Sequence, residues 1–175
     1  AVGETDQAKL HKLFTELEFK TLLKTEETKK PPSTSNGPVS KDNYHAIFTR
    51  KDLDGLIKEL KKAKVLAFDT ETDSLDFTQA NLVGLSVATD EENAYYIPVG
   101  HDYEGAPKQL DRDEVLKKLK PIIEKTPLIG QHLKFDRNVL ANYNIQLNAI
   151  ENDTMLMSYV YDPTATRHNL DAMAS

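Results

Sequence analysis

The stretch that decides the fold is Val65-Leu66-Ala67-Phe68-Asp69-Thr70-Glu71. Its first four residues form a short, continuous apolar run, which is typical of a central β-strand. Two carboxylates follow directly, and in an extended chain residues i and i+2 point to the same face. We therefore expect Asp69 and Glu71 to project together from the C-terminal end of this strand, where open α/β sheets place their ligand crevice.

The spacing of these two acids is uninformative by itself, because the chain holds nine acid-x-acid pairs among its 28 acidic residues. The position directly after an apolar strand distinguishes Asp69 and Glu71 from the other pairs. Two carboxylates about 4 Å apart repel by ~1 kcal/mol in water and by ~4 kcal/mol at an effective dielectric constant of 20. A divalent cation between them, or protonation of one acid, removes that repulsion. Ligation by oxygen alone favours Mg²⁺ or Mn²⁺.

Strand and helix patterns alternate around this stretch. The residues at 49–52 fit a capping box, and an acidic turn at 89–93 joins two strand patterns. We predict strands at 44–48, 65–68, 82–88, 94–99 and 128–130, and helices that begin near residues 50, 111, 134 and 153, the last one reaching residue 161. Hairpin-like strands followed by alternating helices and strands indicate an α/β fold with a mixed sheet flanked by helices.

The N-terminal part differs in character. Leu10, Leu13, Phe14 and Leu17 have helical spacing, so we predict a helical segment within residues 1–23. Residues 24–43 are polar and hold three of the eight prolines, a linker composition that cannot offset its own ordering entropy. Residues 44–175 form the remaining domain.

Composition narrows the function classes. The 175 residues include no cysteine, which excludes disulfides, cysteine–zinc sites and thiol nucleophiles. No run approaches the ~18 apolar residues of a membrane span. The net charge of −6 falls wholly in residues 44–175, which hold 15 basic and 21 acidic residues. We expect a soluble, intracellular protein that does not hold nucleic acid by charge alone.

A second cluster of polar residues lies at 129–136, read as Ile129-Gly130-Gln131-His132-Leu133-Lys134-Phe135-Asp136. A glycine–polar bend after a short strand leads here into a helix with Asp136 in its first turn. An aspartate at that place can also do no more than compensate the helix dipole. Both interpretations stay open on these residues alone.

Together these segments resemble the 3′–5′ proofreading exonuclease domain of bacterial DNA polymerase I. Residues 65–75 resemble its first motif and 131–136 its second, and the likeness extends through 80–86, 96–103, 152–156 and 167–171. It covers about residues 38–175. The helix at 10–23 more weakly resembles the end of the preceding 5′-nuclease domain, which would make 24–37 an interdomain linker.

The resemblance implies a ribonuclease-H-like fold and two-metal hydrolysis of the 3′-terminal phosphodiester. Asp69 and Glu71 would hold the two ions, Mg²⁺ or Mn²⁺ with Zn²⁺ as an option at one site, and Asp136 would help through water. The residues implied in substrate binding are Thr72, Leu75, His132, Lys134 and Arg167. Leu75 matches the residue that wedges against the terminal base, with a core leucine as the alternative. Lys134 and Arg167 either steady phosphates or are solvated surface charges.

The implied partners are the 3′ end of single-stranded DNA, a nucleoside monophosphate product and the remainder of a polymerase chain. We expect a monomer without membrane contacts, working in the bacterial cytoplasm at the nucleoid.

Two departures from the family pattern affect these expectations. His132 stands where the family often has asparagine, and the third motif, Tyr-x-x-x-Asp, is missing, because none of the seven tyrosines has an aspartate four residues later. We therefore expect a fragment of a longer protein, incomplete at its C-terminus, with weak or no activity.

Two other functions stay open. The first is a catalytically silent ribonuclease-H-like scaffold, which three intact carboxylates disfavour. The second is a ribonuclease or editing exonuclease that acts alone, which the N-terminal helix and linker disfavour.

Overall fold

A computed structural model describes residues 6–17, 43–164 and 167–173. The chain divides into two units, Ala1–Val39 and Ser40–Ser175. In the first, helix α1 spans Gln7–Glu16, and the Asp6 side chain caps it by accepting a hydrogen bond from the Lys9 amide. The predicted helix is confirmed to Glu16. Residues 18–23 and nearly all of the predicted linker lie outside the described residues.

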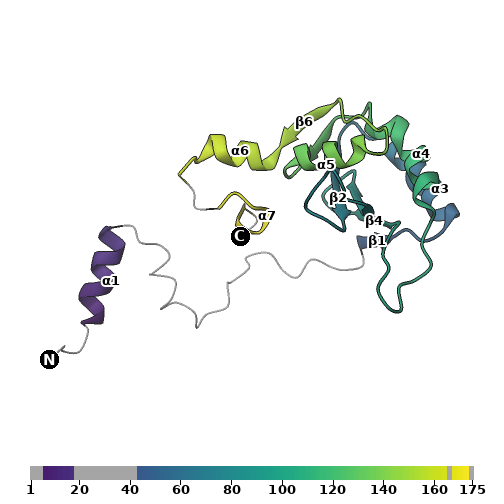
Figure 1. Cartoon of the computed structure of the whole chain (residues 1–175). Helices are drawn as coiled ribbons and strands as arrows, with labels where there is room; N and C mark the ends of the chain where they lie inside the picture. Colours follow the sequence, from purple (N-terminus) through teal and green to yellow (C-terminus); the bar gives the residue numbers. More distant parts are fainter. Residues whose placement is uncertain (1–5, 18–42, 165–166, 174–175) are drawn as a thin grey trace. The chain divides into compact units, whose positions relative to one another are not determined.

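The described residues of the second unit form a six-stranded mixed sheet with the order β1-β4-β3-β2-β5-β6 (Figure 1). The strands are β1 (Tyr44–Ala46), β2 (Leu66–Thr72), β3 (Leu82–Ala88), β4 (Ala94–Pro98), β5 (Leu128–Gly130) and β6 (Ile150–Asp153). The β2–β3 and β3–β4 pairs are antiparallel, and β1–β4, β2–β5 and β5–β6 are parallel. The predicted mixed sheet is confirmed.

Five helices of this unit are described: α3 (Arg50–Leu60), α4 (Arg112–Ile123), α5 (Leu133–Ala141), α6 (Thr154–Tyr161) and α7 (Leu170–Met173). Thr49 caps α3 as predicted, by accepting from the Asp52 amide. The sequence did not predict β6 or α7. Strand β6 reads Ile-Glu-Asn-Asp, which has no apolar run, and it exists because the edge of β5 supplies its backbone partners.

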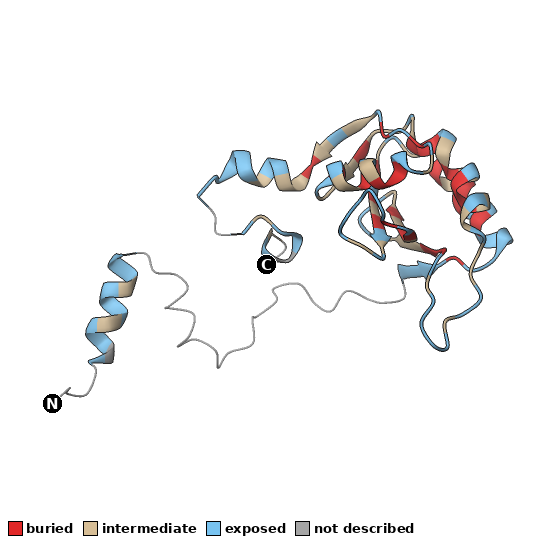
Figure 2. Ribbon diagram, in the orientation of Figure 1, coloured by how far each residue is buried: buried red, intermediate tan, exposed pale blue. Residues whose placement is uncertain are grey.

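The two faces of the sheet differ in cover. Alternate residues of β2, Leu66, Phe68 and Thr70, are buried. The two apolar ones join a single core with residues of α3, α4 and α5, and Figure 2 shows the buried residues concentrated in these elements. We call this side the covered face; it includes Phe68, Thr70, Leu85, Val87, Tyr95 and Ile97. The opposite side, here the open face, carries Ala67, Asp69, Glu71, Gly84, Ser86, Ala88, Ala94 and Tyr96.

Strand β2 runs further than the sequence indicated. It continues to Thr72, so Asp69 lies inside the strand and not at its end. The physical reason is that β3 keeps pairing with β2, with Asp69 opposite Ser86 and Glu71 opposite Gly84. On its other edge, β2 pairs with β5 only at Leu66 and Ala67. Beyond Ala67 that edge of β2 is open to other partners.

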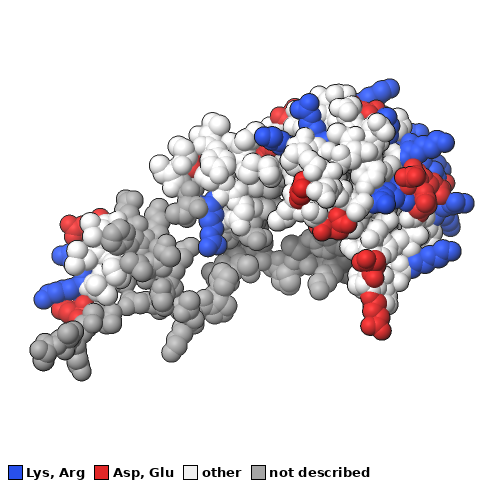
Figure 3. All heavy atoms as spheres, in the orientation of Figure 1, with Lys and Arg blue, Asp and Glu red and all other residues white. Residues whose placement is uncertain are grey.

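The outer surface of α3 and α4 holds charges of both signs. Figure 3 shows blue and red side chains mixed on the side of the molecule where these two helices lie. Two ion pairs join the helices, Arg50–Glu114 at 2.8 Å and Lys118–Asp54 at 2.6 Å. Such mixed charge is typical of a solvated helix surface. None of the described helices is long and apolar enough to cross a membrane.

Candidate active site

The free edge of β2 brings the predicted acids together. Asp69 is half-buried and Glu71 exposed, and both lie on the open face, as their i, i+2 spacing predicts. The neighbouring strand β5 stops at Gly130. The space next to β2 beyond that point is taken by the first turn of α5, which contains Asp136.

Asp136 is buried and bonded to β2. Its Oδ1 atom accepts hydrogen bonds from the Thr70 amide at 2.9 Å and from the Thr70 hydroxyl at 2.6 Å. Because β5 has ended, this carboxylate replaces the strand partner that the Thr70 amide would otherwise lack. Compensation of the helix dipole does not require burial, and Asp136 is only 2% exposed. Asp136 therefore does more than compensate the helix dipole, because it also joins the start of α5 to β2.

The three acids interact electrostatically. Burial raises the pKa of Asp69 to about 6, with further increases from the charges of Asp136 and Glu71. Burial also raises the pKa of Asp136, against the opposing effect of its hydrogen bonds from Thr70. Asp69 and Asp136 thus sit in surroundings that disfavour their own negative charge, and a nearby cation would relieve that cost.

The donor chemistry of the site fits a divalent cation. Asp69, Glu71 and Asp136 offer oxygen atoms only, the ligands that Mg²⁺ and Mn²⁺ prefer. In the part of the chain that the structure describes, no three His, Cys, Asp or Glu side chains are gathered closely enough to hold an ion as they stand. The exposed Glu71 side chain has the freedom to complete the ligand set.

Asp153 positions the helix that carries Asp136. Its carboxylate accepts from the amides of His132 (3.1 Å) and Leu133 (2.8 Å), at the start of α5. The same carboxylate caps α6 by accepting from the amides of Met155 and Leu156. One buried aspartate therefore fixes two helix N-termini. The sequence predicted that a helix begins near Asp153, but not the contact of Asp153 with α5, which lies 20 residues earlier.

The turn from β5 into α5 is tight. A Cβ atom on Gly130 would lie 2.6 Å from the Phe68 carbonyl oxygen, so only glycine allows this approach. His132 follows with φ 61° and ψ 40°, in the left-handed region, and its side chain makes no capping hydrogen bond. Asparagine, histidine and aspartate tolerate this conformation best among non-glycine residues. The backbone therefore explains why His132 can replace asparagine.

The predicted substrate-binding residues differ in exposure: Leu75, His132, Lys134 and Arg167 are exposed, and Thr72 is partly buried. Leu75 is 93% exposed, so the alternative of a core leucine is wrong. The Thr72 hydroxyl donates to the Ser74 carbonyl at 2.8 Å and shapes the turn after β2. Lys134 and Arg167 are exposed, and neither forms an ion pair with another described residue. His132 lies near enough for its charge to lower the pKa of Asp136.

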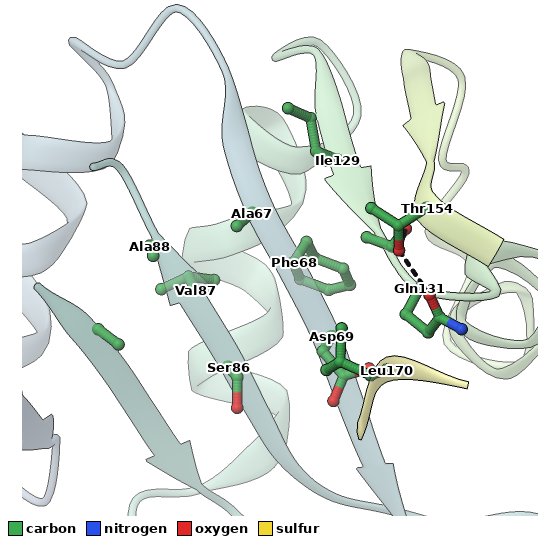
Figure 4. A pocket seen from close by; sticks show the side chains of 12 residues that line it. Ala67, Phe68, Asp69, Ser86, Val87, Ala88, Ile129, Gln131, Thr154 and Leu170 are labelled. Carbon is green, nitrogen blue, oxygen red and sulfur yellow. Dashed lines mark hydrogen bonds between the residues drawn. The ribbon is translucent and has the colours of Figure 1, made fainter. Parts of the chain in front are cut away.

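A groove of about 490 Å³ on the open face is lined by Asp69, while Glu71 and Asp136 lie outside its lining. Figure 4 shows Asp69 and Ser86 side by side on neighbouring strands, with Gln131, Thr154 and Leu170 along the other wall. The Gln131 amide links these elements: its oxygen accepts from the Thr154 hydroxyl at 2.5 Å, and its nitrogen donates to the His168 carbonyl at 2.9 Å. The His168 ring stacks on Tyr159 with centroids 3.7 Å apart.

Sequence reasoning missed Thr70 and Gln131 as positioning residues. Thr70 lies between the two acids of the first motif, and Gln131 begins the second, so both stood within the stretches singled out. Their contacts reach 66 and 37 residues along the chain. No local pattern could have revealed partners at such distances.

Comparisons with known proteins agree with this geometry. The family model described as 3′-5′ exonuclease matches residues 44–175. Over 98% of its length, the chain is 44% identical to DNA polymerase I of Pseudomonas aeruginosa, of which it covers 20%. The chain thus spans about a fifth of that relative.

Two solved structures share the fold. The first is the "POL domain of Pol1 from M. smegmatis complex with DNA primer-template and dNTP", with a TM-score of 0.58, 16% identity, and coverage of 74% of this chain and 21% of that one. The second is "Brucella melitensis NrnC with bound Mg2+", with a TM-score of 0.52, 20% identity, and coverage of 76% and 59%. At these identities the likeness supports the fold alone.

Proposed function

The chain belongs to the 3′–5′ exonuclease family, and from this premise we propose that it supplies the carboxylate centre of a proofreading exonuclease within a bacterial DNA polymerase. The observation that carries the proposal is that Asp69 lies within electrostatic range of both Glu71 and Asp136, at the edge of β2 beyond the end of β5. The raised pKa of Asp69, caused by burial and by the other two acids, supports a site built to share a cation.

The proposed reaction is hydrolysis of the 3′-terminal phosphodiester of single-stranded DNA. Two divalent ions, Mg²⁺ or Mn²⁺ with Zn²⁺ as an option at one site, would activate a water and stabilise the leaving 3′ oxygen when bound. Asp69 and Glu71 offer their carboxylate oxygens as direct ligands. Asp136, held by Thr70, would help hold the second ion through water.

Exposed side chains around the acids would bind the DNA strand. Leu75 projects from the turn after β2 and would wedge against the terminal base. Lys134 and Arg167 are exposed and would steady phosphates, and Thr72 at the end of β2 and His132 at the start of α5 would contribute to binding. The product is a nucleoside monophosphate.

The remaining partner is the rest of the polymerase chain, which would supply much of the grip on DNA, because residues 44–175 are acidic overall. We propose a monomer that works in the bacterial cytoplasm at the nucleoid.

The decisive variant is Asp69→Ala in a full-length polymerase that carries this chain. Exonuclease activity on single-stranded DNA with Mg²⁺ should fall by about 10³-fold or more, because the variant loses part of the several kcal/mol that a bound ion contributes. Folding should persist. Glu91→Ala, an exposed acid in the β3–β4 turn, is the matched control and should keep full activity. Unchanged activity in Asp69→Ala would instead indicate a silent scaffold.

The 175-residue chain alone should be a poor nuclease. It holds no Tyr-x-x-x-Asp, so one acid of the implied metal site and the tyrosine that would orient the water are missing. The measurement compares its rate with that of a longer polypeptide that includes such a motif. Equal rates would show that the three acids described here suffice.

A further inference from the structure

A fourth polar side chain on the open face has no part in the function proposed so far. Tyr96 of β4 stands opposite Ser86 of β3, which stands opposite Asp69 of β2. Residues paired across neighbouring strands share a face of the sheet. Tyr96 therefore lies on the same face as the acids, two strands away from Asp69.

Gly84 lets this tyrosine reach toward Glu71. A Cβ atom on Gly84 would lie 2.0 Å from the Tyr96 hydroxyl oxygen and 2.4 Å from the ring carbon that bears it. The phenol therefore lies flat over Gly84, and Gly84 is the strand partner of Glu71. Consistent with this placement, the Glu71 charge adds to burial in raising the pKa of Tyr96. The tyrosine crosses one strand and ends beside the second acid.

His101 fixes the orientation of the hydroxyl. Its Nε2 atom lies 2.5 Å from the Tyr96 hydroxyl oxygen. Gln109 holds His101 in turn from both sides, because its amide oxygen accepts from the His101 amide at 2.8 Å and its amide nitrogen donates to the His101 carbonyl at 2.7 Å. The ring of Tyr103 packs edge-on against the imidazole at 5.9 Å. His101 thus holds the Tyr96 hydroxyl, and Gln109 holds His101.

The hydroxyl keeps free hydrogen-bonding capacity on the side of Glu71. An ionised carboxylate only accepts hydrogen bonds, so Glu71 needs the hydroxyl proton of Tyr96. That proton is available in the tautomer in which His101 Nε2 carries its hydrogen and donates to the Tyr96 oxygen. Glu71 is exposed, and its carboxylate has no hydrogen-bond partner among the described residues. Because the Tyr96 hydroxyl lies over Gly84, the strand partner of Glu71, a hydrogen bond between the two groups, direct or through one water, would join neighbouring positions of the open face.

We propose that Tyr96, oriented by His101, is a positioning residue that hydrogen-bonds Glu71 and fixes this carboxylate in the orientation that holds a divalent ion. This inference rests on the exonuclease function proposed above and deepens it. Partners that orient metal ligands in this way typically change metal affinity or activity by 10–100-fold when they are removed. Tyr96 acts through Glu71 and is assigned no contact with the reacting atoms.

The first test is Tyr96→Phe in the full-length polymerase, with Tyr95→Phe as the matched control. The Tyr95 hydroxyl also makes a hydrogen bond, to Glu59 at 3.0 Å, but on the covered face. For Tyr96→Phe, kcat should fall about 10-fold while KM for single-stranded DNA stays within about twofold. Tyr95→Phe should keep both values. Equal kinetics of the two variants would overturn the proposal.

A second measurement does not depend on hydrolysis. Mn²⁺ binding is titrated on the same proteins, and Tyr96→Phe should weaken it by about 10-fold, whereas Tyr95→Phe should not. Unchanged Mn²⁺ affinity in Tyr96→Phe would overturn the proposal.

A pair of variants tests the role of His101. His101→Gln keeps a hydrogen-bonding group and should recover part of the kcat lost in His101→Leu.

Asp69→Ala separates this proposal from the exonuclease function itself. If Asp69→Ala keeps activity, the exonuclease function fails. If Asp69→Ala is inactive while Tyr96→Phe matches the wild type, only the role of Tyr96 fails.

Discussion

The two faces of the sheet are built from the same strands but differ in composition: the covered face packs into the hydrophobic core, and the open face carries Asp69 and Glu71. On the covered face, Phe68 and its neighbours pack into a core with three helices, and Thr70 binds the buried Asp136. On the open face, Ala67, Ser86 and Ala88 are small, and the acids stand among them. Two neighbouring residues of β2 therefore differ in their effect: Thr70 binds Asp136 and stabilises the fold, whereas the ionised Asp69 carboxylate is disfavoured by its surroundings.

This difference shows how the site can be held rigidly although it disfavours its own charges. The covered face supplies the free energy of folding, since deeply buried apolar groups contribute most of it. The sheet then tolerates the repulsion that Asp69 experiences from Glu71 on the open face and from the buried Asp136. Mutations on the two faces should therefore have effects of different size and sign.

The largest expected effect on stability is on the covered face. Phe68 is 3% exposed, so Phe68→Ala should lower the free energy of unfolding by about 3–5 kcal/mol through lost burial and a cavity. Leu75→Ala removes a large apolar side chain that is 93% exposed and should cost less than about 0.5 kcal/mol. Urea denaturation of the 175-residue chain measures both values. Similar losses would mean that the open side is as well packed as the covered one.

The next effect concerns the two hydroxyls next to the acids. Thr70→Val removes the hydroxyl that donates to the buried Asp136, and should cost about 1–3 kcal/mol because a buried acceptor loses a partner. Ser86→Ala, on the open face beside Asp69, should change stability by less than about 0.5 kcal/mol. The same denaturation experiment applies. A larger loss for Ser86→Ala would reverse the ranking of the faces.

The pH dependence of folding stability tests whether Asp69, on the open face, destabilises the protein when it is ionised. Asp69 has a pKa of about 6 in the folded protein against about 3.9 in an unfolded chain. Its contribution to stability is therefore fully present below about pH 4 and is lost as pH rises through 6. At pH 7.5 without divalent ions, Asp69→Asn should be more stable than the wild type by about 1 kcal/mol, a value reduced for partial exposure.

The gain from Asp69→Asn should largely vanish at pH 4, where the wild-type carboxyl is protonated in the folded state and about half protonated in the unfolded state. Asp90→Asn is the control, because amides of Asn93 and Glu92 lower the pKa of the Asp90 carboxyl. Its contribution to stability is present at neutral pH and is lost as pH falls, so its substitution should have the opposite sign at pH 7.5. Thermal denaturation measures the stability of both variants. A gain in stability from both would point to a general effect of net charge.

The smallest effect is expected where the two faces meet, at the start of α5. His132 has φ 61°, which asparagine tolerates at least as well, so His132→Asn should change stability by less than about 0.5 kcal/mol. His132→Ala should cost about 1 kcal/mol, because alanine is disfavoured in this region. Thermal melts distinguish the two variants. Equal losses would show that the imidazole contributes through contacts and not through its backbone.

The fold was predictable wherever its signal is local. The apolar run before Asp69, the acidic turn between β3 and β4, and the cap at Thr49 each indicated an element that the structure confirms. Strand β6 was not predictable, because its sequence gains strand structure only from the edge of β5. The length of β2 was set in the same way, since β3 pairs with it as far as Thr72.

The candidate site was predictable in part for the same reason. Asp69 and Glu71 share a face because of their spacing, and Asp136 follows a recognisable turn. The groups that hold them were not predictable. Asp153 reaches back 20 residues to the start of α5, and Tyr96 lies beside Glu71 only because Gly84 leaves room.

The sequence by itself determined the family and the mixed sheet and singled out the three acids as candidates, since motifs and hydrophobic periodicity depend on neighbouring residues. The tertiary structure alone decided that Asp136 is buried against Thr70, that Leu75 is exposed, and that Tyr96 lies over Gly84 with His101 at its hydroxyl. These are contacts between residues far apart in the chain. They depend on which strands pair and where each one ends, and backbone pairing of that kind leaves no mark on local composition.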